Sequence, residues 1–131
     1  MLIKLNKGDE IDILAPSSFI EKEDDFTKGI EILKQWGLSI NLNNALFKRV
    51  GYFAGDDETR FKELIKAQNS KLIIFAKGGW GSARLLEKDP TWANGLMLGF
   101  SDTCSLLLSK YSQGYFGSIH GPMVTSLCKE P

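Results

Sequence analysis

Ser101 stands in a stretch of sequence that could display a nucleophilic serine. The segment Gly99-Phe100-Ser101-Asp102 joins a predicted apolar strand to a predicted helix by a turn of almost no length. Such a turn holds the serine Oγ clear of the backbone at a helix start, which is the mechanical requirement of a nucleophile elbow. The backbone N–H of Asp102 would then face an oxyanion formed at Ser101. Thr103 replaces the second glycine of the usual Gly-x-Ser-x-Gly pattern, which disfavours an ordinary α/β-hydrolase.

Ser101 and Asp102 also have a plainer interpretation. Serine and aspartate are common helix caps, so either side chain could simply cap the helix that follows. The Asp102 side chain could instead brace the turn. Because a Gly-x-Ser tripeptide is common, the local pattern by itself favours capping over catalysis.

A second candidate site is the glycine-rich segment Lys77-Gly78-Gly79-Trp80-Gly81-Ser82, directly after an apolar run. Three glycines in four positions let the backbone approach a ligand and present amide donors to an anionic group. Trp80 is expected to form a partly exposed wall of a pocket. Gly79-Trp80-Gly81 could alternatively open a dinucleotide fingerprint with Asp102 as its acidic residue, although Arg84 occupies the position of the third glycine.

The remaining reactive residue types give weaker signals. His120 is the only histidine; it could act as a base if its loop folded back toward Ser101, but a lone histidine at a strand end is more often a structural hydrogen-bonding residue. Cys104 and Cys128 lie in no metal-binding or disulfide pattern, and Cys104 is expected to pack in the core.

Composition excludes several classes of function. The chain has 131 residues, of which 43% are hydrophobic and 24% charged, so one globular domain is expected. Sixteen basic and sixteen acidic residues give a formal charge of zero, so neither nucleic acid nor an acidic membrane is an expected partner. The apolar run at 72–76 is too short to cross a bilayer, and the charged N-terminal segment is unlike a secretory signal. The composition therefore predicts a soluble, cytoplasmic protein.

Short strand-like runs alternate with helical patterns along the whole chain, which is typical of a parallel sheet with helices on both faces. The fold class predicted is α/β: an open, mostly parallel, three-layer sheet of the flavodoxin or Rossmann kind. Strands are expected at about 10–15, 38–42, 72–76, 96–100 and 115–119. The run at 72–76 is apolar on both faces and should lie in the middle of the sheet. Ligands of such folds bind at the carboxyl ends of the strands, where both candidate segments would lie.

Helical spacing predicts the elements between these strands. One helix carries Phe26, Ile30, Leu33 and Trp36 on a core-facing side, and a second begins at the cap residue Asp56. A third should bury Cys104, Leu107, Leu108 and Tyr111. The tail at 120–131 shows no further periodic element, and 119–131 is expected to begin a linker.

Five segments in this order together resemble the LD-carboxypeptidase family, which includes murein tetrapeptide carboxypeptidases and microcin C immunity proteins. They are GDEIDILAPSS, GYFAGDDETR, LIIFAKGGWGSARLL, LGFSDTCSLLL and IHGPM, and they cover nearly the whole chain. The resemblance implies an N-terminal α/β domain at 1–131 and a smaller, β-rich C-terminal domain that is absent from these residues. The glycine segment is more similar to the murein branch, with Lys77 in place of the usual arginine.

The resemblance implies a serine hydrolase that removes a terminal D-amino acid, D-Ala, from a murein peptide without a metal or an organic cofactor. Ser101 takes the nucleophile position, and the amides of Asp102 and Gly79 form the oxyanion hole. The segment with Gly78, Trp80, Gly81 and Ser82 would bind the substrate. A glutamate and a histidine come from the family's second domain, since His120 matches the IHGPM segment rather than the catalytic histidine.

These implications lead to an expectation about the chain by itself. A nucleophile without its base and orienting residue loses about 10³-fold or more of its rate, so the isolated residues should be nearly inactive. The expected partners are a murein peptide or related small peptide, the missing C-terminal domain, and a second copy in a homodimer. The alternative function is a non-enzymatic α/β module that binds a peptide or a nucleotide in the same place.

Overall fold

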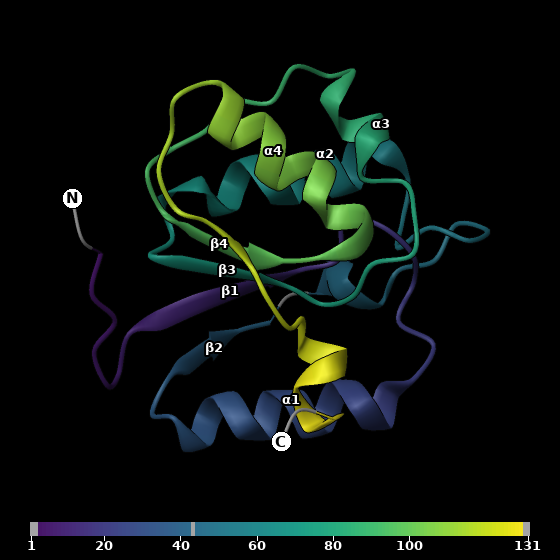
Figure 1. Ribbon diagram of the computed structural model, residues 1–131. Helices are drawn as coiled ribbons and strands as arrows, with labels where there is room; N and C mark the ends of the chain where they lie inside the picture. The colour runs from purple at the N-terminus through teal and green to yellow at the C-terminus, as the bar shows by residue number, and fades with distance from the viewer. Residues whose placement is uncertain (1–2, 43, 130–131) are drawn as a thin grey trace.

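The computed structural model describes residues 3–42 and 44–129, which form a parallel five-stranded sheet in the order β2-β1-β3-β4-β5 (Figure 1). This arrangement confirms the predicted α/β class. Each strand ends within one or two residues of its predicted C-terminal limit. The strands are β1 Glu10–Leu14, β2 Ser39–Asn41, β3 Leu72–Phe75, β4 Leu96–Gly99 and β5 Ser118–His120.

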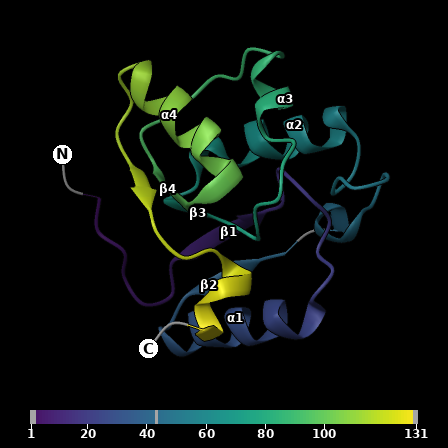
Figure 2. The same ribbon diagram turned by 45° about the vertical axis from the view of Figure 1, so that its right-hand side comes forward.

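Helices cover both faces of the sheet. α1 (Glu23–Gln35) lies on one face together with the 3₁₀ helix η4 (Val124–Lys129), and both views in Figures 1 and 2 place them side by side. The opposite face carries α2, α3 and α4. Their bounds are α2 Asp57–Lys66, α3 Ala83–Leu86 and α4 Cys104–Ser112, and the remaining 3₁₀ turns are η1 Asn44–Phe47, η2 Ala67–Asn69 and η3 Ser101–Thr103. In the described part of the chain, no helix has the length and apolar character needed to span a membrane.

The burial of β3 explains why this strand lies at the centre of the sheet. All four of its residues are buried, because Leu72 and Ile74 contribute to the core under α1 while Ile73 and Phe75 contribute to the core under α2 and α4. Successive side chains of a strand point to opposite faces, so a strand covered on both faces must be apolar throughout. The predicted central position of this run is confirmed.

The start of α2 is also confirmed. Asp56 is its N-cap, and the Asp56 carboxylate accepts a hydrogen bond from the backbone N–H of Thr59 at 2.7 Å. This bond satisfies one of the amide groups that a helix leaves unpaired in its first turn. Hydrogen bonding to that N–H lowers the pKa of Asp56.

The predicted buried face of the last α-helix is wrong by one residue. Leu108 and Tyr111 are exposed, whereas Thr103, Leu106, Leu107 and Lys110 are buried at the same spacing. The last of these buried residues is a lysine, so the buried face does not appear as a continuous apolar pattern in the sequence. Lys110 can occupy it because its long apolar stem packs inside while its ammonium group donates a hydrogen bond to the carbonyl oxygen of Gly95.

Two further expectations need correction. Trp36 is not a core residue: α1 ends at Gln35, and the Trp36 ring just beyond the helix is 58% exposed. The tail is not free of structure either, because η4 packs against α1 and buries Val124 and Leu127. A 3₁₀ turn repeats every three residues and is too short to show a recognisable hydrophobic period.

Burial of Lys110 should make stability depend on alkaline pH. Desolvation lowers the pKa of this lysine from 10.5 to about 8 in the folded protein. Between those two pH values the unfolded chain binds more protons than the folded chain, so the free energy of unfolding should rise with pH. The expected gain from pH 8 to 10.5 is on the order of 2 kcal/mol. Urea unfolding of the wild type and of Lys110→Met checks it: the rise should be smaller in the variant, and equal slopes would contradict the prediction.

Candidate functional site

Ser101 lies at the carboxyl end of β4 in a backbone conformation that is rare for a serine. Its φ is +58°, in the left-handed region, and its side chain is exposed. A methyl group added to Gly78 would lie 3.5 Å from the Ser101 Oγ, so the serine hydroxyl stands beside the glycine segment. The two candidate segments are therefore neighbours, as the parallel sheet predicts. A strained, exposed serine between a strand and a helix is the arrangement of a nucleophile elbow.

Gly99 allows this turn to be tight. A Cβ atom at Gly99 would lie 2.4 Å from Thr103 Oγ1 and 2.7 Å from the Phe75 ring. The Thr103 hydroxyl also donates a hydrogen bond of 2.8 Å to the carbonyl oxygen of Phe100, which closes the turn. The chain can therefore bend back over the end of β4 only because position 99 has no side chain.

The glycine segment presents bare backbone at its centre. Gly79 is exposed and has a φ of +102°, and a Cβ atom there would lie 2.4 Å from Ser18 Oγ and 2.7 Å from the Tyr52 hydroxyl oxygen. The buried Ser18 holds the segment by donating a 2.7 Å hydrogen bond to the carbonyl oxygen of Gly78. A side chain at Gly79 would therefore be strained and obstructed.

Three aromatic rings pack together beside the glycine segment and form a surface that we call the aromatic wall: Tyr52, Phe53 and Trp80. The Trp80 ring centre lies 6.1 Å from that of Tyr52 and 5.7 Å from that of Phe53. Trp80 is 59% exposed, which confirms the predicted exposure of this side chain. The wall gives a ligand at the glycine segment an apolar surface to contact.

Asp102 braces the turn instead of capping a helix. Its Oδ2 accepts a 2.6 Å hydrogen bond from the Ser17 hydroxyl and a 3.0 Å hydrogen bond from the backbone N–H of Ser82. The Ser82 hydroxyl donates to the backbone oxygen of Asp102 at 2.8 Å. No side chain caps α4, so the capping interpretation of Ser101 and Asp102 is wrong. The bracing interpretation agrees with the contacts.

The same contacts disfavour the dinucleotide alternative. The Oδ2 of Asp102 accepts two hydrogen bonds within the protein, so this carboxylate has structural partners where a ribose-binding carboxylate would face its ligand. The helix after the glycine segment, α3, has only four residues, too short for the helix that receives a pyrophosphate.

Arg60 is a site residue that our sequence reasoning did not single out. Only 3% of its surface is exposed, and its guanidinium group donates to the carbonyl oxygens of Pro16 at 2.6 Å, Gly81 at 3.0 Å and Gly55 at 3.2 Å, and also pairs with Asp57. Burial lowers the pKa of Arg60, and the nearby Asp57 carboxylate opposes that change. Arg60 is the last residue of the segment GYFAGDDETR and lies inside a predicted amphipathic helix. An arginine at that place was the signal that the sequence offered.

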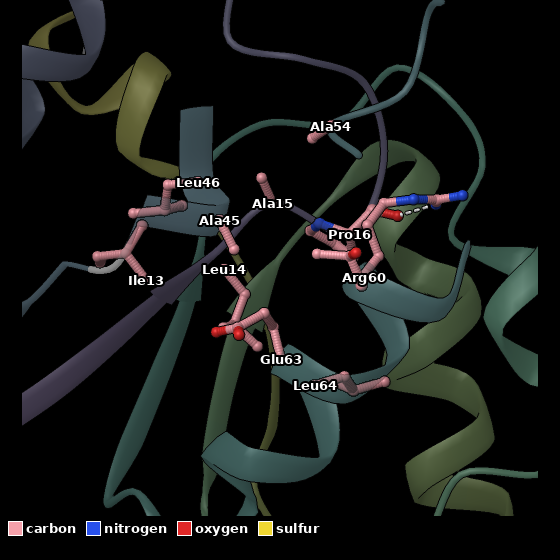
Figure 3. A pocket seen from close by; sticks show the side chains of 11 residues that line it. Ile13, Leu14, Ala15, Pro16, Ala45, Leu46, Ala54, Arg60, Glu63 and Leu64 are labelled. Atoms are coloured by element: carbon pink, nitrogen blue, oxygen red, sulfur yellow. Dashed lines mark hydrogen bonds between the residues drawn. The ribbon is translucent and has the colours of Figure 1, made fainter. Parts of the chain in front are cut away.

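Figure 3 shows Arg60 at one end of a small cavity, with its hydrogen bond to Pro16 drawn. The cavity has a volume of about 10 Å³ and also borders Leu14, Ala54 and Leu64. This volume holds about one water molecule, so the cavity is not a substrate pocket. The exposed Ser101 lies outside it.

The other predicted residues have distinct surroundings. Gly78, Gly81 and Ser82 are buried, and the contacts of Ser82 with Asp102 favour a bracing role over direct contact with substrate. The His120 ring packs edge-on with the Phe100 ring, and the two ring centres are 6.1 Å apart. In the described residues, no hydrogen bond joins His120 to Ser101. Cys104 packs at the edge of the core, as expected. Over residues 3–42 and 44–129, no group of three or more His, Cys, Asp or Glu side chains could hold a metal ion.

Comparison with known sequences assigns most of the chain to one family. Residues 11–121 match the LD-carboxypeptidase N-terminal domain. A protein of Synechocystis sp. strain PCC 6803, named as a candidate carboxypeptidase, is 35% identical over 98% of this chain and 44% of its own length. A Bacillus subtilis protein named as a murein peptide carboxypeptidase is 29% identical over 93% of this chain and 40% of its own. The chain thus spans less than half of these curated relatives.

Solved structures have the same fold. MccF in complex with glutamyl sulfamoyl guanosine aligns with a TM-score of 0.82 at 22% identity, covering 97% of this chain and 41% of MccF. Muramoyltetrapeptide carboxypeptidase from Oxalobacter formigenes aligns with a TM-score of 0.68 at 25% identity, covering 88% of this chain and 40% of that one. Both similarities cover most of this chain and less than half of each solved chain.

Proposed function

The chain belongs to the LD-carboxypeptidase family, and from this premise we propose that it is the nucleophile-bearing domain of a serine peptidase that removes the terminal D-alanine from murein peptides. One observation carries the proposal: Ser101 is exposed at φ +58° beside Gly78, at the carboxyl edge of the sheet. A conformation this costly for a serine is kept where it serves a function more often than elsewhere. The murein peptide carboxypeptidase of Bacillus subtilis supports the substrate class.

In the proposed reaction, the Ser101 Oγ attacks the carbonyl carbon of the terminal peptide bond. The carbonyl oxygen becomes an oxyanion, which accepts hydrogen bonds from the backbone N–H groups of Gly79 and Asp102. Collapse of this intermediate breaks the C–N bond, releases D-alanine with a proton on its amine, and leaves an acyl ester on Ser101. Water then hydrolyses the ester and restores the hydroxyl.

We assign proton transfer to groups outside residues 1–131. The family resemblance supplies a glutamate and a histidine from a second domain, and His120 contacts Phe100 rather than Ser101. A serine hydroxyl without a neighbouring base is a weak nucleophile at neutral pH. These 131 residues should therefore bind the peptide and release little D-alanine from it.

Trp80 should contribute to peptide binding through the aromatic wall. Loss of its exposed ring in Trp80→Ala removes apolar contact worth about 1–1.5 kcal/mol, or about a tenfold increase in Kd. Titration of the isotope-labelled chain with a murein tetrapeptide ending in D-Ala, followed by NMR, checks this value. Trp36→Ala is the matched control, because Trp36 is 58% exposed against 59% for Trp80 but follows the distant helix α1. It should leave the Kd unchanged.

The same titration tests the proposed function. The amide signals of Gly79 and Asp102 should shift with the D-Ala peptide and shift less with a peptide ending in L-Ala. Shifts confined to other parts of the chain, or equal affinity for both peptides, would contradict the assignment.

A nucleotide-binding module is the second candidate, favoured by one observation. The exposed Trp80 ring beside the bare backbone of Gly79 could stack on a base while the amides face a phosphate. A titration with adenosine monophosphate separates the two functions. Shifts at Gly79 with the nucleotide and none with the peptide would replace our proposal with this one.

A further inference from the structure

One peptide group links two opposite charges of the site, the buried Arg60 and the half-buried Asp102. The carbonyl oxygen of Gly81 accepts a hydrogen bond from Arg60 at 3.0 Å, and the N–H of the same peptide bond, on Ser82, donates to Asp102 at 3.0 Å. The Gly81–Ser82 peptide group therefore lies between a guanidinium and a carboxylate. Each charge polarises the group in the direction that strengthens the hydrogen bond to the other.

A second bridge runs through the loop after β1. Arg60 donates to the carbonyl oxygen of Pro16 at 2.6 Å, and the hydroxyl of the next residue, Ser17, donates to Asp102 at 2.6 Å. Ser17, Ser82 and Arg60 are all buried, so these bonds are shielded from water. Arg60 and Asp102 thus hold the same two loops from opposite sides, an arrangement that we call the Arg60–Asp102 clamp.

Asp102 is also the residue next to Ser101. The left-handed conformation of Ser101 is unfavourable for any residue with a Cβ, so something must hold it. Neither end of the turn is held by a helix cap, since η3 and α4 both begin without a side-chain cap. Thr103 closes the turn locally through its bond to the carbonyl oxygen of Phe100, and the carboxylate of Asp102 ties the turn to two other loops.

We propose that Arg60 and Asp102 are positioning residues that hold the Ser101 turn in its strained conformation through the Gly81–Ser82 peptide group and the Pro16–Ser17 loop. The inference deepens the proposed function, because it explains how this domain presents the nucleophile without help from another one. The backbone N–H of Asp102 belongs to the proposed oxyanion hole, but the side chains of Arg60 and Asp102 do not touch the reacting atoms. They act through Ser101 and through the glycine segment beside it.

A double-mutant cycle on the full chain tests the clamp by thermal unfolding. Ser101→Gly relieves the left-handed strain, and Ser17→Ala removes one bond of the clamp without altering the turn itself. If the clamp holds the strain, the change in Tm caused by Ser101→Gly should be more favourable by about 2–4 °C in the wild type than in Ser17→Ala. The entropy that glycine adds to the unfolded chain is the same in both backgrounds and cancels.

Asp89 provides the matched control, because it is exposed and has a φ of +53°. Asp89→Gly should change Tm equally with and without Ser17→Ala. Equal effects of Ser101→Gly in the two backgrounds would overturn the clamp. If Ser17→Ala shows no cooperative transition, Asp102→Asn replaces it in the same cycle with the same expected difference. The cycle needs no substrate, so a failed peptide titration and a failed clamp remain separate results.

Discussion

Replacing Arg60 with methionine should lower the free energy of unfolding by about 3–5 kcal/mol, because a buried guanidinium that donates to three carbonyl oxygens is lost. Methionine fills much of the same volume but donates no hydrogen bond. The carbonyl oxygens of Pro16, Gly55 and Gly81 would then be left without this donor, and Asp57 would lose a cationic partner. Most domains have 5–15 kcal/mol of stability in total, so this loss is severe.

Arg60→Lys separates charge from geometry. A lysine keeps the positive charge but has one nitrogen on a flexible stem, so it cannot reach three carbonyl oxygens and a carboxylate together. We expect a loss of about 2 kcal/mol. Urea unfolding of both variants gives the measurement.

Arg84→Met is the control for both Arg60 variants. Arg84 also pairs with Asp57, at 2.7 Å, but 53% of its side chain is exposed. An exposed ion pair contributes about 0–1 kcal/mol, so this variant should remain close to the wild type. If Arg84→Met cost as much as Arg60→Met, the pairing with Asp57 would explain the stability, and the hydrogen bonds to the carbonyl oxygens would not.

The sequence predicted those parts of the fold that follow from a simple period. The apolar run of β3 placed it at the centre of the sheet, and the alternation of strand and helix gave the parallel class. The buried face of α4 was missed by one position, because Lys110 buries its stem and pairs its ammonium group with a carbonyl oxygen. Hydrophobicity scales assign one value to a whole side chain and cannot represent such a split.

The candidate site also has a part that the sequence predicted and a part that it did not. Ser101 and the glycine segment were predictable, because a turn of that length and a run of glycines leave a local signature. The contacts of Ser17 and Arg60 were not, since their partners lie far away in sequence: Ser17 bonds to Asp102, and Arg60 to the carbonyl oxygen of Pro16. Contacts between loops of separate strands depend on the sheet order, which local patterns do not contain.

The second large effect is expected at Gly29, on the face of α1 that meets η4. Intrinsic helix propensity favours Gly29→Ala by about 1 kcal/mol. The contact predicts the opposite, because a Cβ at Gly29 would lie 2.0 Å from the carbonyl oxygen of Val124. That oxygen belongs to the backbone, so the whole of η4 would have to move. Partial loss of the burial of Val124 and Leu127 should cost about 3 kcal/mol, which outweighs the propensity gain.

The effect of Gly29→Ala should extend to the candidate site. Thr125 at the start of η4 donates its N–H to the carbonyl oxygen of Ala76 at 3.0 Å, directly before the glycine segment. Urea unfolding measures the stability, and NMR shifts of Gly78 and Gly79 report the displacement. Lys28→Ala, on the exposed face of the same helix, should change neither. A Gly29→Ala variant more stable than the wild type would mean that η4 yields without cost. Unchanged shifts of Gly78 and Gly79 would mean that the glycine segment does not depend on its anchor at Ala76.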